Sequence, residues 1–387
     1  MTDPLLSWRK EFPIVDTCTY LVSHSLGAMP NRTAANLQEF AEIWSRRGVR
    51  AWSEGWWELG RTTGDLLAPI LGVAPGTISM HQNVTVAEGV IGSCFRYDGP
   101  RRRIVMSDLE FPTNMYLFEG FRRYGAEIVY VASPDTIKPD LERLLDAIDE
   151  RTLLVPLSLV LFRSAYLQDA RAVIEKAHRV GAYVILDVYQ AAGTVPLDIT
   201  AMEADFAVGG SVKWLCGGPG AGYLYVRPDL APHLEPGFSG WAAHARPFEF
   251  ATGANIYAAP PERFQSGTPN VPTLYAARAG YEIVAEIGVE AIRAKSLRLT
   301  RRMMNLADEA GFRLHTPRND AERGGAVIVD VPNGEAVTHE LIRRDIIVDY
   351  RPGAGIRMAP HFYNSEEDIE HAMHVLTAIA PGERVGR

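Results

Sequence analysis

Short runs of apolar, often β-branched residues alternate with stretches of helical periodicity through the middle of the chain. Six of these runs predict β-strands, at residues 103–106, 127–131, 153–157, 183–187, 205–209 and 222–226. Helices with one buried face are predicted between them, because apolar side chains recur three and four positions apart at residues 113–124, 140–148 and 168–180. Strand runs this apolar are expected where both faces of a sheet are covered. The pattern therefore predicts an α/β fold with a mostly parallel sheet between helices.

The rhythm changes after about residue 272. A long helical stretch covers 274–310, and a βαβ-like tail follows, with strands at 326–331, 346–349 and 356–358. A last helix begins at Ser365, whose hydroxyl and the Asp368 carboxylate are spaced as in a capping box. We expect this tail to form a smaller α/β domain whose sheet also takes in residues 20–27. The predicted large domain spans 45–272, and the small domain combines 1–44 with 273–387.

Composition narrows the class of protein. The chain has 387 residues, of which 47% are hydrophobic and 22% charged, so a disordered tail and a small disulfide scaffold are excluded. A formal net charge of −8 argues against nucleic acid as the main partner. The three cysteines lie far apart and fit no zinc spacing, and His371 and His374 lack a third ligand, so no metal site is expected. Without a signal-like or membrane-spanning apolar run, we expect a soluble, cytoplasmic protein that contacts no membrane.

Two charged residues stand where ligands collect in parallel sheets, at the carboxyl ends of strands. Asp187 ends the apolar run 183–187, although a carboxylate there could also cap the next turn. Lys213 follows an apparently buried strand and precedes a glycine-rich stretch. Lysine is rare in this chain, and the remaining lysines are explained by solvated positions: Lys10, Lys138, Lys176 and Lys295. A desolvated lysine becomes a nucleophile toward carbonyl groups, whereas the alternative is a surface lysine in a turn.

Two further features belong to the same predicted sheet edge. The segment 82–89 enters a helix with Thr85 at its start, and a helix N-terminus binds phosphate well. Phe111 follows the strand at 103–106 and offers a flat ring. An amine, a carboxylate, a phosphate cradle and a ring together are the groups that a protein supplies to pyridoxal 5′-phosphate.

Six segments occur in the order seen in kynureninases. They read YLVSHSLG at 20–27, EFPTN at 110–114, DVYQAAG at 187–193, SVKWL at 211–215, RFQSGTP at 263–269 and IRMAP at 356–360. The chain also resembles the wider class V aminotransferase group of fold-type I pyridoxal-phosphate enzymes, over nearly its whole length. The resemblance implies the fold-type I transferase fold and a homodimer with shared active sites.

The resemblance also implies roles for individual residues. Lys213 would form a Schiff base with the cofactor and then carry the substrate's α-proton, and Asp187 would hold a proton on the pyridine nitrogen. Arg357 would grip the α-carboxylate of an amino-acid substrate. The remaining implied positions are Gln190 near the phenolic oxygen, Phe111 on the ring, Val84, Thr85 and Ser211 at the phosphate, Trp241 and Thr268 from the partner subunit, and Asn114, Ser25 and His24 beside the substrate.

The chain departs from the kynureninase pattern at the positions that serve hydrolysis. Gln190 stands where those enzymes usually have His, Val212 where they have Tyr, and residues 46–50 lack the His that contacts the kynurenine ring. Our leading interpretation is therefore a lyase that removes a Cβ substituent from an L-amino acid, such as a cysteine S-conjugate β-lyase or a related decarboxylating or deaminating enzyme of bacterial secondary metabolism. The alternatives are a kynureninase that hydrolyses kynurenine to anthranilate and alanine, a class V aminotransferase, and a non-catalytic homologue.

Overall fold

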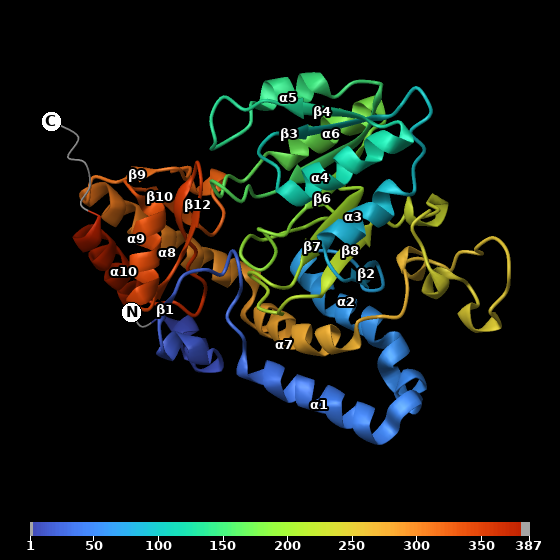
Figure 1. The fold of residues 1–387 in the computed structure, drawn as a ribbon, viewed down its shortest axis with the longest axis horizontal. Helices are drawn as coiled ribbons and strands as arrows, with labels where there is room; N and C mark the ends of the chain where they lie inside the picture. Colours follow the sequence, from blue (N-terminus) through green and yellow to red (C-terminus); the bar gives the residue numbers. More distant parts are fainter. Residues whose placement is uncertain (1–2, 381–387) are drawn as a thin grey trace.

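A seven-stranded sheet forms the centre of the protein in the computed structural model, which describes residues 3–380 (Figure 1). Its strand order is β2-β8-β7-β6-β5-β3-β4, and all neighbours are parallel except for β8, which runs antiparallel to β2 and β7. The predicted α/β fold with a mostly parallel sheet is confirmed, although sequence reasoning missed β2. The strands are β2 (Ile78–His81), β3 (Arg103–Ser107), β4 (Glu127–Val131), β5 (Thr152–Ser158), β6 (Tyr183–Asp187), β7 (Phe206–Gly210) and β8 (Gly222–Val226).

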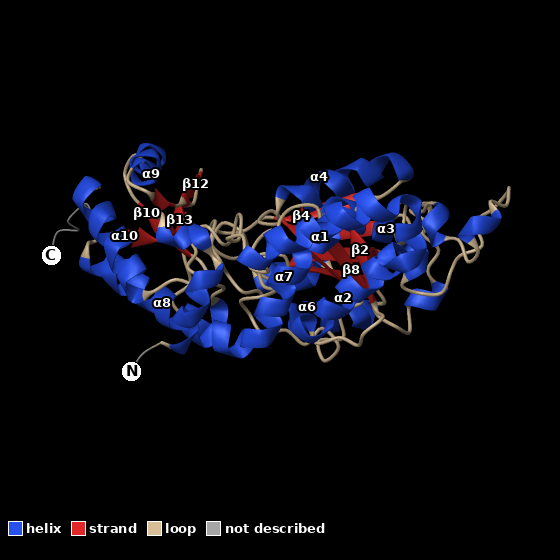
Figure 2. Ribbon diagram, turned by 90° about the horizontal axis from the view of Figure 1, so that it is seen from below, coloured by secondary structure: helices blue, strands red, loops and turns tan. Residues whose placement is uncertain are grey.

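Helices cover both faces of this sheet, as Figure 2 shows from the side. They are α1 (Asn31–Arg47), α2 (Trp57–Leu71), α3 (Val84–Gly92), α4 (Pro112–Gly120), α5 (Leu141–Ala147), α6 (Ala170–Val180) and α7 (Val271–Ile287). Ile185 of β6 packs in one apolar cluster with α3 and α4, whereas Val184 and Leu186 pack in another with α2, α6 and α7. Because strand residues alternate between faces, Asp187 lies on the side of α3 and α4.

A smaller sheet near the C-terminus has the order β12-β13-β10-β9, with every neighbouring pair antiparallel. The βαβ-like arrangement predicted for this tail is present in split form, because β10 and β12 are both antiparallel to β13 and therefore run parallel to each other, with α9 (Gly334–Arg343) between them in the chain. Residues 19–20 do pair with this region, but through the parallel pair β1–β11, with a further bridge between Val22 and Ala359. The strands are β1 (Thr19–Tyr20), β9 (Arg313–Leu314), β10 (Val327–Asp330), β11 (Ile346–Ile347), β12 (Asp349–Arg351) and β13 (Gly355–Met358).

The small sheet packs against α8 (Val289–Glu309), α9 (Gly334–Arg343) and α10 (Glu366–Ile379) around an apolar cluster of its own. The predicted continuous helix at 274–310 is two helices, because Gly288 adopts a φ of +85° that an α-helix does not allow. The capping box of Ser365 and Asp368 at the start of α10 is present as predicted. The domain boundaries at residues 44–45 and 272–273 remain a prediction.

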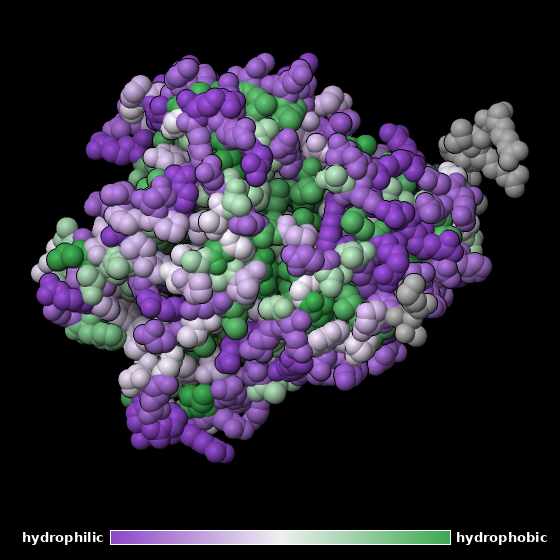
Figure 3. Space-filling view, turned by 180° about the vertical axis from the view of Figure 1, so that it is seen from behind, coloured by the Kyte–Doolittle hydropathy of each residue, from purple (hydrophilic) through white to green (hydrophobic). Residues whose placement is uncertain are grey.

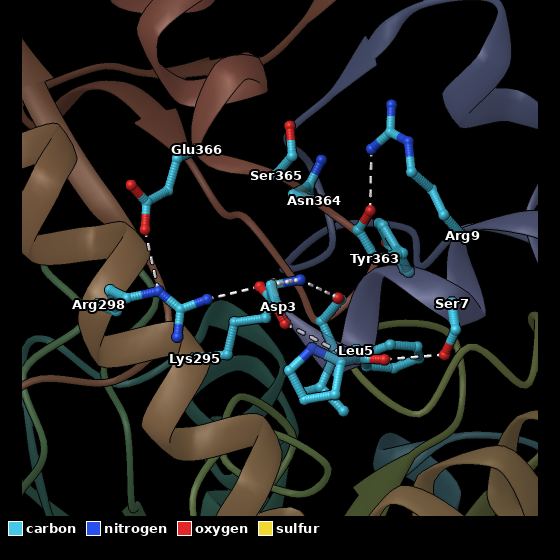
Figure 4. Close-up of polar contacts among 12 residues, drawn as sticks. Asp3, Leu5, Ser7, Arg9, Lys295, Arg298, Tyr363, Asn364, Ser365 and Glu366 are labelled. Carbon is cyan, nitrogen blue, oxygen red and sulfur yellow. Dashed lines mark hydrogen bonds and ion pairs between the residues drawn. The ribbon is translucent and has the colours of Figure 1, made fainter. Parts of the chain in front are cut away.

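The N-terminal segment is fastened to the small sheet's helices (Figure 4). Lys295 of α8 is only 2% exposed, and its ammonium group donates to the Phe362 carbonyl oxygen and pairs with Asp3 at 3.0 Å. Arg298 also pairs with Asp3, at 2.5 Å. The expectation of a solvated Lys295 is wrong, since a helical context does not reveal which face a distant segment covers.

Short helical turns complete the described chain: η1 (Pro4–Glu11), η2 (Pro13–Asp16), η3 (Gly48–Ala51), η4 (Trp52–Trp56), η5 (Phe121–Tyr124), η6 (Ala231–His233), η7 (Trp241–Ala243), η8 (Pro247–Glu249), η9 (Glu262–Phe264) and η10 (Asp320–Glu322). On the face shown in Figure 3, apolar residues gather along the middle and polar residues surround them. Within residues 3–380, no helix has both the length and the apolar character to cross a membrane.

Candidate active site

A cavity of about 190 Å³ lies at the carboxyl ends of the parallel strands. Its walls come from the start of α3, the start of α4 and the segments that follow β5, β6 and β7. This is the edge at which sequence reasoning placed the ligand. The lining residues are Asn83, Val84, Thr85, Phe111, Thr113, Asn114, Ser158, Val160, Phe162, Asp187, Tyr189, Gln190 and Lys213.

Lys213 enters the cavity from the turn after β7. Its Nζ lies 4.2 Å from the ring centroid of Tyr189 and 5.4 Å from that of Phe111. Burial lowers the pKa of this amine to about 8, with the nearby Asp187 opposing the shift and Arg357 adding to it. A larger fraction of the amine is therefore uncharged at neutral pH than in an exposed lysine, and an uncharged amine is the nucleophilic form.

The backbone around Lys213 is held by its neighbours. The N–H of Gly27 donates to the Val212 carbonyl at 2.7 Å, and that of Cys216 donates to the Lys213 carbonyl at 3.0 Å. A Cβ at Gly27 would clash with the Lys213 carbonyl oxygen, so this close approach requires glycine. The lysine is thereby fixed at its backbone and free only at its side chain.

Asp187 ends β6 inside the cavity. Its Oδ1 accepts a hydrogen bond from the N–H of Tyr189 at 2.9 Å. Burial raises the pKa of this carboxyl, while the Tyr189 N–H, the Lys213 amine and the neighbouring Asn114 act in the opposite direction. The other carboxylate oxygen accepts no hydrogen bond within residues 3–380 and can receive one from a ligand.

The start of α3 supplies unused donors. The Asn83 side chain caps the helix by accepting from the Val86 N–H at 3.0 Å. The N–H groups of Val84 and Thr85 lie in the first turn, where an α-helix gives them no partner, and the Thr85 side chain is exposed to the cavity. These groups and the helix dipole suit an anion.

Ser211 was expected at the same anion but lies outside the cavity lining. Its hydroxyl donates to the Ala221 carbonyl at 2.5 Å and is also hydrogen-bonded to the Tyr281 hydroxyl. In this structure the side chain links the end of β7 to the start of β8 and to α7, and its contact with a phosphate remains a prediction.

Arg357 of β13 is clamped by Asp349 next to the cavity. Its Nε and Nη2 donate to the two Asp349 oxygens at 2.7 and 2.5 Å, and Nη1 donates to the Phe162 carbonyl at 2.8 Å. Burial acts to raise the pKa of Asp349, but hydrogen bonds from His24 and Arg357 outweigh it and hold that pKa well below its usual value. Three of the five guanidinium N–H groups are used, which leaves two for a ligand carboxylate.

His24 and Gln190 form a second layer beneath these charges. His24 is buried, which lowers its pKa to about 4, so its neutral ring donates from Nε2 to Asp349 at 3.1 Å. The Gln190 amide donates to the His24 carbonyl at 3.0 Å and accepts from the Trp214 indole at 3.0 Å. The expected Gln190 therefore borders the cavity, but most of its hydrogen-bonding capacity serves the protein.

The other expected residues fall into two groups. Phe111 and Asn114 line the cavity, Phe111 with 40% exposure and Asn114 completely buried. Ser25 is half-buried outside the lining, and Trp241 and Thr268 also lie away from the cavity. Trp241 packs edge-on against Trp57 at 5.4 Å. The contribution of Trp241 and Thr268 to a partner's site remains a prediction.

Sequence reasoning missed three residues that shape the site. Tyr189 lies within the motif that carries Asp187, so its spacing two residues later could have indicated a shared turn. Asp349 ends a predicted strand at 346–349, as Asp187 ends its own. Phe162, whose ring meets that of Phe111 edge-on at 5.1 Å, follows β5 without any signal in the sequence.

The chain is similar to known proteins both in sequence and in fold. The family model described as aminotransferase class-V matches residues 67–371. A kynureninase from Pseudomonas fluorescens is 31% identical over 396 residues, covering 97% of this chain and 92% of that protein. A cysteine desulfurase from Thermococcus onnurineus NA1 superimposes with a TM-score of 0.86 at 22% identity over 98% of both chains. A variant of C-DES with glycine covalently linked to its PLP cofactor gives a TM-score of 0.85 at 21% identity, over 95% of this chain and 98% of that one.

Proposed function

Because the chain belongs to the class V aminotransferase family of pyridoxal 5′-phosphate-dependent enzymes, we propose that it hydrolyses the Cβ–Cγ bond of kynurenine or a close analogue. The observation that carries this proposal is the near full-length similarity to kynureninases, at 31% identity to the Pseudomonas fluorescens protein. The reaction consumes one water, so that L-kynurenine and water give anthranilate and L-alanine. Our leading sequence-based interpretation, a Cβ lyase, has less support than this alternative.

The residues in the cavity fit pyridoxal 5′-phosphate. Lys213 offers a buried amine for the aldehyde, and Asp187 offers an unused carboxylate oxygen for the ring nitrogen. The first turn of α3 offers free N–H groups and the Thr85 hydroxyl for the phosphate, and Phe111 offers an accessible ring for stacking. When bound, this cofactor supplies an electron sink that labilises bonds at the substrate's Cα.

The chain's own residues would hold and deprotonate the substrate. Arg357 keeps two N–H groups for the α-carboxylate, and Asp349 fixes the plane of its guanidinium group. Lys213 Nζ, with a pKa of about 8, can accept a proton from Cα and return it as the product forms. Phe111 and Phe162 form an apolar wall that suits an aromatic substrate side chain.

The experiment is a product assay with purified holoenzyme. L-kynurenine should give fluorescent anthranilate together with an equal amount of alanine, and Lys213→Ala should abolish both. Absence of anthranilate at millimolar kynurenine, with the cofactor bound, would refute the proposed substrate class.

A Cβ lyase is the second candidate, because Gln190 and Val212 depart from the kynureninase pattern. Gln190 is bonded to the protein at both ends of its amide, so it offers less to a water-dependent step than an imidazole. A cysteine S-conjugate should then release thiol, pyruvate and ammonia in the same assay, and no anthranilate should form from kynurenine.

We propose that the protein works as a homodimer in the cytoplasm. Apolar side chains stand exposed on the projecting segment around Trp241, notably Phe248 at 59% and Phe250 at 75%. This segment projects away from the large sheet (Figure 1). Light scattering should show a particle of twice the chain mass of 42.7 kDa, and a monomer would refute this part of the proposal.

A further inference from the structure

Glu88 is a buried carboxyl group that the proposed chemistry does not use. It lies on α3, one turn after Val84 and Thr85, and its side chain is completely shielded from solvent. Neither of its oxygens has a hydrogen-bond partner within residues 3–380. Buried polar groups in folded proteins nearly always have a partner, in the protein or in an ordered water, so this one calls for an explanation.

The surroundings of Glu88 are acidic. Asp187 at the end of β6 and Glu110 in the loop before α4 both lie close enough to raise its pKa, in addition to the larger effect of burial, and the shift is large. Glu110 differs from Glu88, because it accepts a hydrogen bond from the Ser158 N–H at 2.7 Å and another from the Ser107 hydroxyl at 3.2 Å. Burial still raises the pKa of Glu110 to about 7 despite these donors, so Glu110 is partly protonated at neutral pH, whereas Glu88 has no such donor and keeps its proton.

A second unpartnered group lies beside Asp187. Asn114 of α4 is completely buried and close enough to Asp187 to lower the pKa of that carboxyl, yet neither its amide nitrogen nor its carbonyl oxygen makes a hydrogen bond of good geometry within the described chain. Helices α3 and α4 pack against each other on the face of the sheet to which Asp187 points. Donors and acceptors left unused on both helices, next to the same carboxylate, are the condition under which proteins hold a buried water.

The geometry points to Glu88 as a positioning residue for Asp187: as a neutral carboxylic acid it donates a hydrogen bond, through a buried water shared with Asn114, to the Asp187 carboxylate. This donor would keep Asp187 anionic and oriented toward the ring nitrogen of the cofactor. The expected effect of Glu88 on cofactor binding rests on the proposed use of pyridoxal 5′-phosphate. The protonation of Glu88 is independent of that proposal.

Two substitutions at Glu88 test whether its side chain acts as an uncharged hydrogen-bond donor or as a charged group. Glu88→Gln keeps the size and a donor without any charge, whereas Glu88→Leu removes the donor. Ile91→Val, at a buried apolar position of the same helix, is the control for packing. The readouts are the affinity of the cofactor-free protein for pyridoxal 5′-phosphate, thermal stability, and the infrared C=O stretch of protonated carboxyl groups at pH 7.

We expect the wild type to show carboxylic-acid absorption, of which Glu88→Gln removes the contribution of Glu88 and leaves that of the partly protonated Glu110. Glu88→Gln and Ile91→Val should bind the cofactor nearly as tightly as the wild type, and Glu88→Leu about tenfold or more weakly, the loss expected for a hydrogen bond to a charged group. The inference is overturned if Glu88→Gln leaves the carboxylic-acid absorption unchanged, if Glu88→Leu binds normally, or if Glu88→Gln is as weak as Glu88→Leu. If Glu88→Leu does not fold, the infrared band and the affinity of Glu88→Gln decide. A wild type that binds no cofactor would refute the proposed function instead, and the infrared result would still report on Glu88.

Discussion

Lys213 is predicted to destabilise the fold that carries it. Its amine has a pKa of about 8 in the folded protein against 10.5 for an ordinary lysine, so folding at pH 7 buries a charged group unfavourably. At about 1.4 kcal/mol per pH unit this amounts to about 3 kcal/mol, and because Lys213 is only partly buried and solvent screens part of the effect, we expect about 2 kcal/mol. Lys213→Met has a similar volume and no charge, so the cofactor-free variant should be more stable than the cofactor-free wild type by about this amount.

The effect has a defined pH dependence. Between pH 8 and 10.5 the folded protein binds fewer protons at Lys213 than the unfolded chain does, so the stability of the wild type rises with pH over this range. Below pH 8 the penalty is complete, and the advantage of Lys213→Met should shrink toward zero as the pH approaches 10.5.

Urea unfolding of both cofactor-free proteins, followed by circular dichroism at pH 7 and again at a pH of about 9.5, measures the difference in the free energy of unfolding. Lys138→Met, at an exposed lysine, is the matched control and should leave stability unchanged. The reasoning is refuted if Lys213→Met is no more stable than the wild type at pH 7, or if its advantage is the same at both pH values.

Two other predictions concern charged pairs. Asp349→Asn should loosen the grip on Arg357, so steady-state kinetics should show KM for the amino-acid substrate rising about tenfold while cofactor affinity stays the same; an unchanged KM would contradict the role given to Asp349. Asp3→Ala should lower the free energy of unfolding by about 1–3 kcal/mol, because the buried Lys295 ammonium group would then keep only the Phe362 carbonyl oxygen as a partner. Lys295→Met in the Asp3→Ala background should restore the urea midpoint, and equal midpoints for the wild type and Asp3→Ala would contradict the account.

The sequence was most informative where local pattern and chain direction determine the structure. Parallel strands place their carboxyl ends at one edge, so Asp187 and Lys213 could be brought together although 26 residues separate them. The same reasoning found Phe111, because it follows the predicted strand at 103–106, whereas the start of α3 was recognised as a helix N-terminus that carries Thr85.

Partners from distant segments could not be predicted in this way. Lys295 looks like an ordinary helical lysine until the N-terminal Asp3 is seen to cover it. The antiparallel order of the small sheet depends on pairings between two-to-four-residue strands, which carry too little pattern to fix a direction. Ser211 was assigned to the phosphate by motif, and no local pattern indicated that Tyr281 from α7 would reach its hydroxyl.

The covalent attachment site tests the central claim most directly. Holoenzyme should be reduced with borohydride, digested, and analysed by mass spectrometry for a lysine that carries the pyridoxyl group. We predict that the label is on the peptide containing Lys213, and that Lys213→Ala carries none. A label on another lysine, or an unlabelled peptide from a protein that has bound the cofactor, would contradict the account.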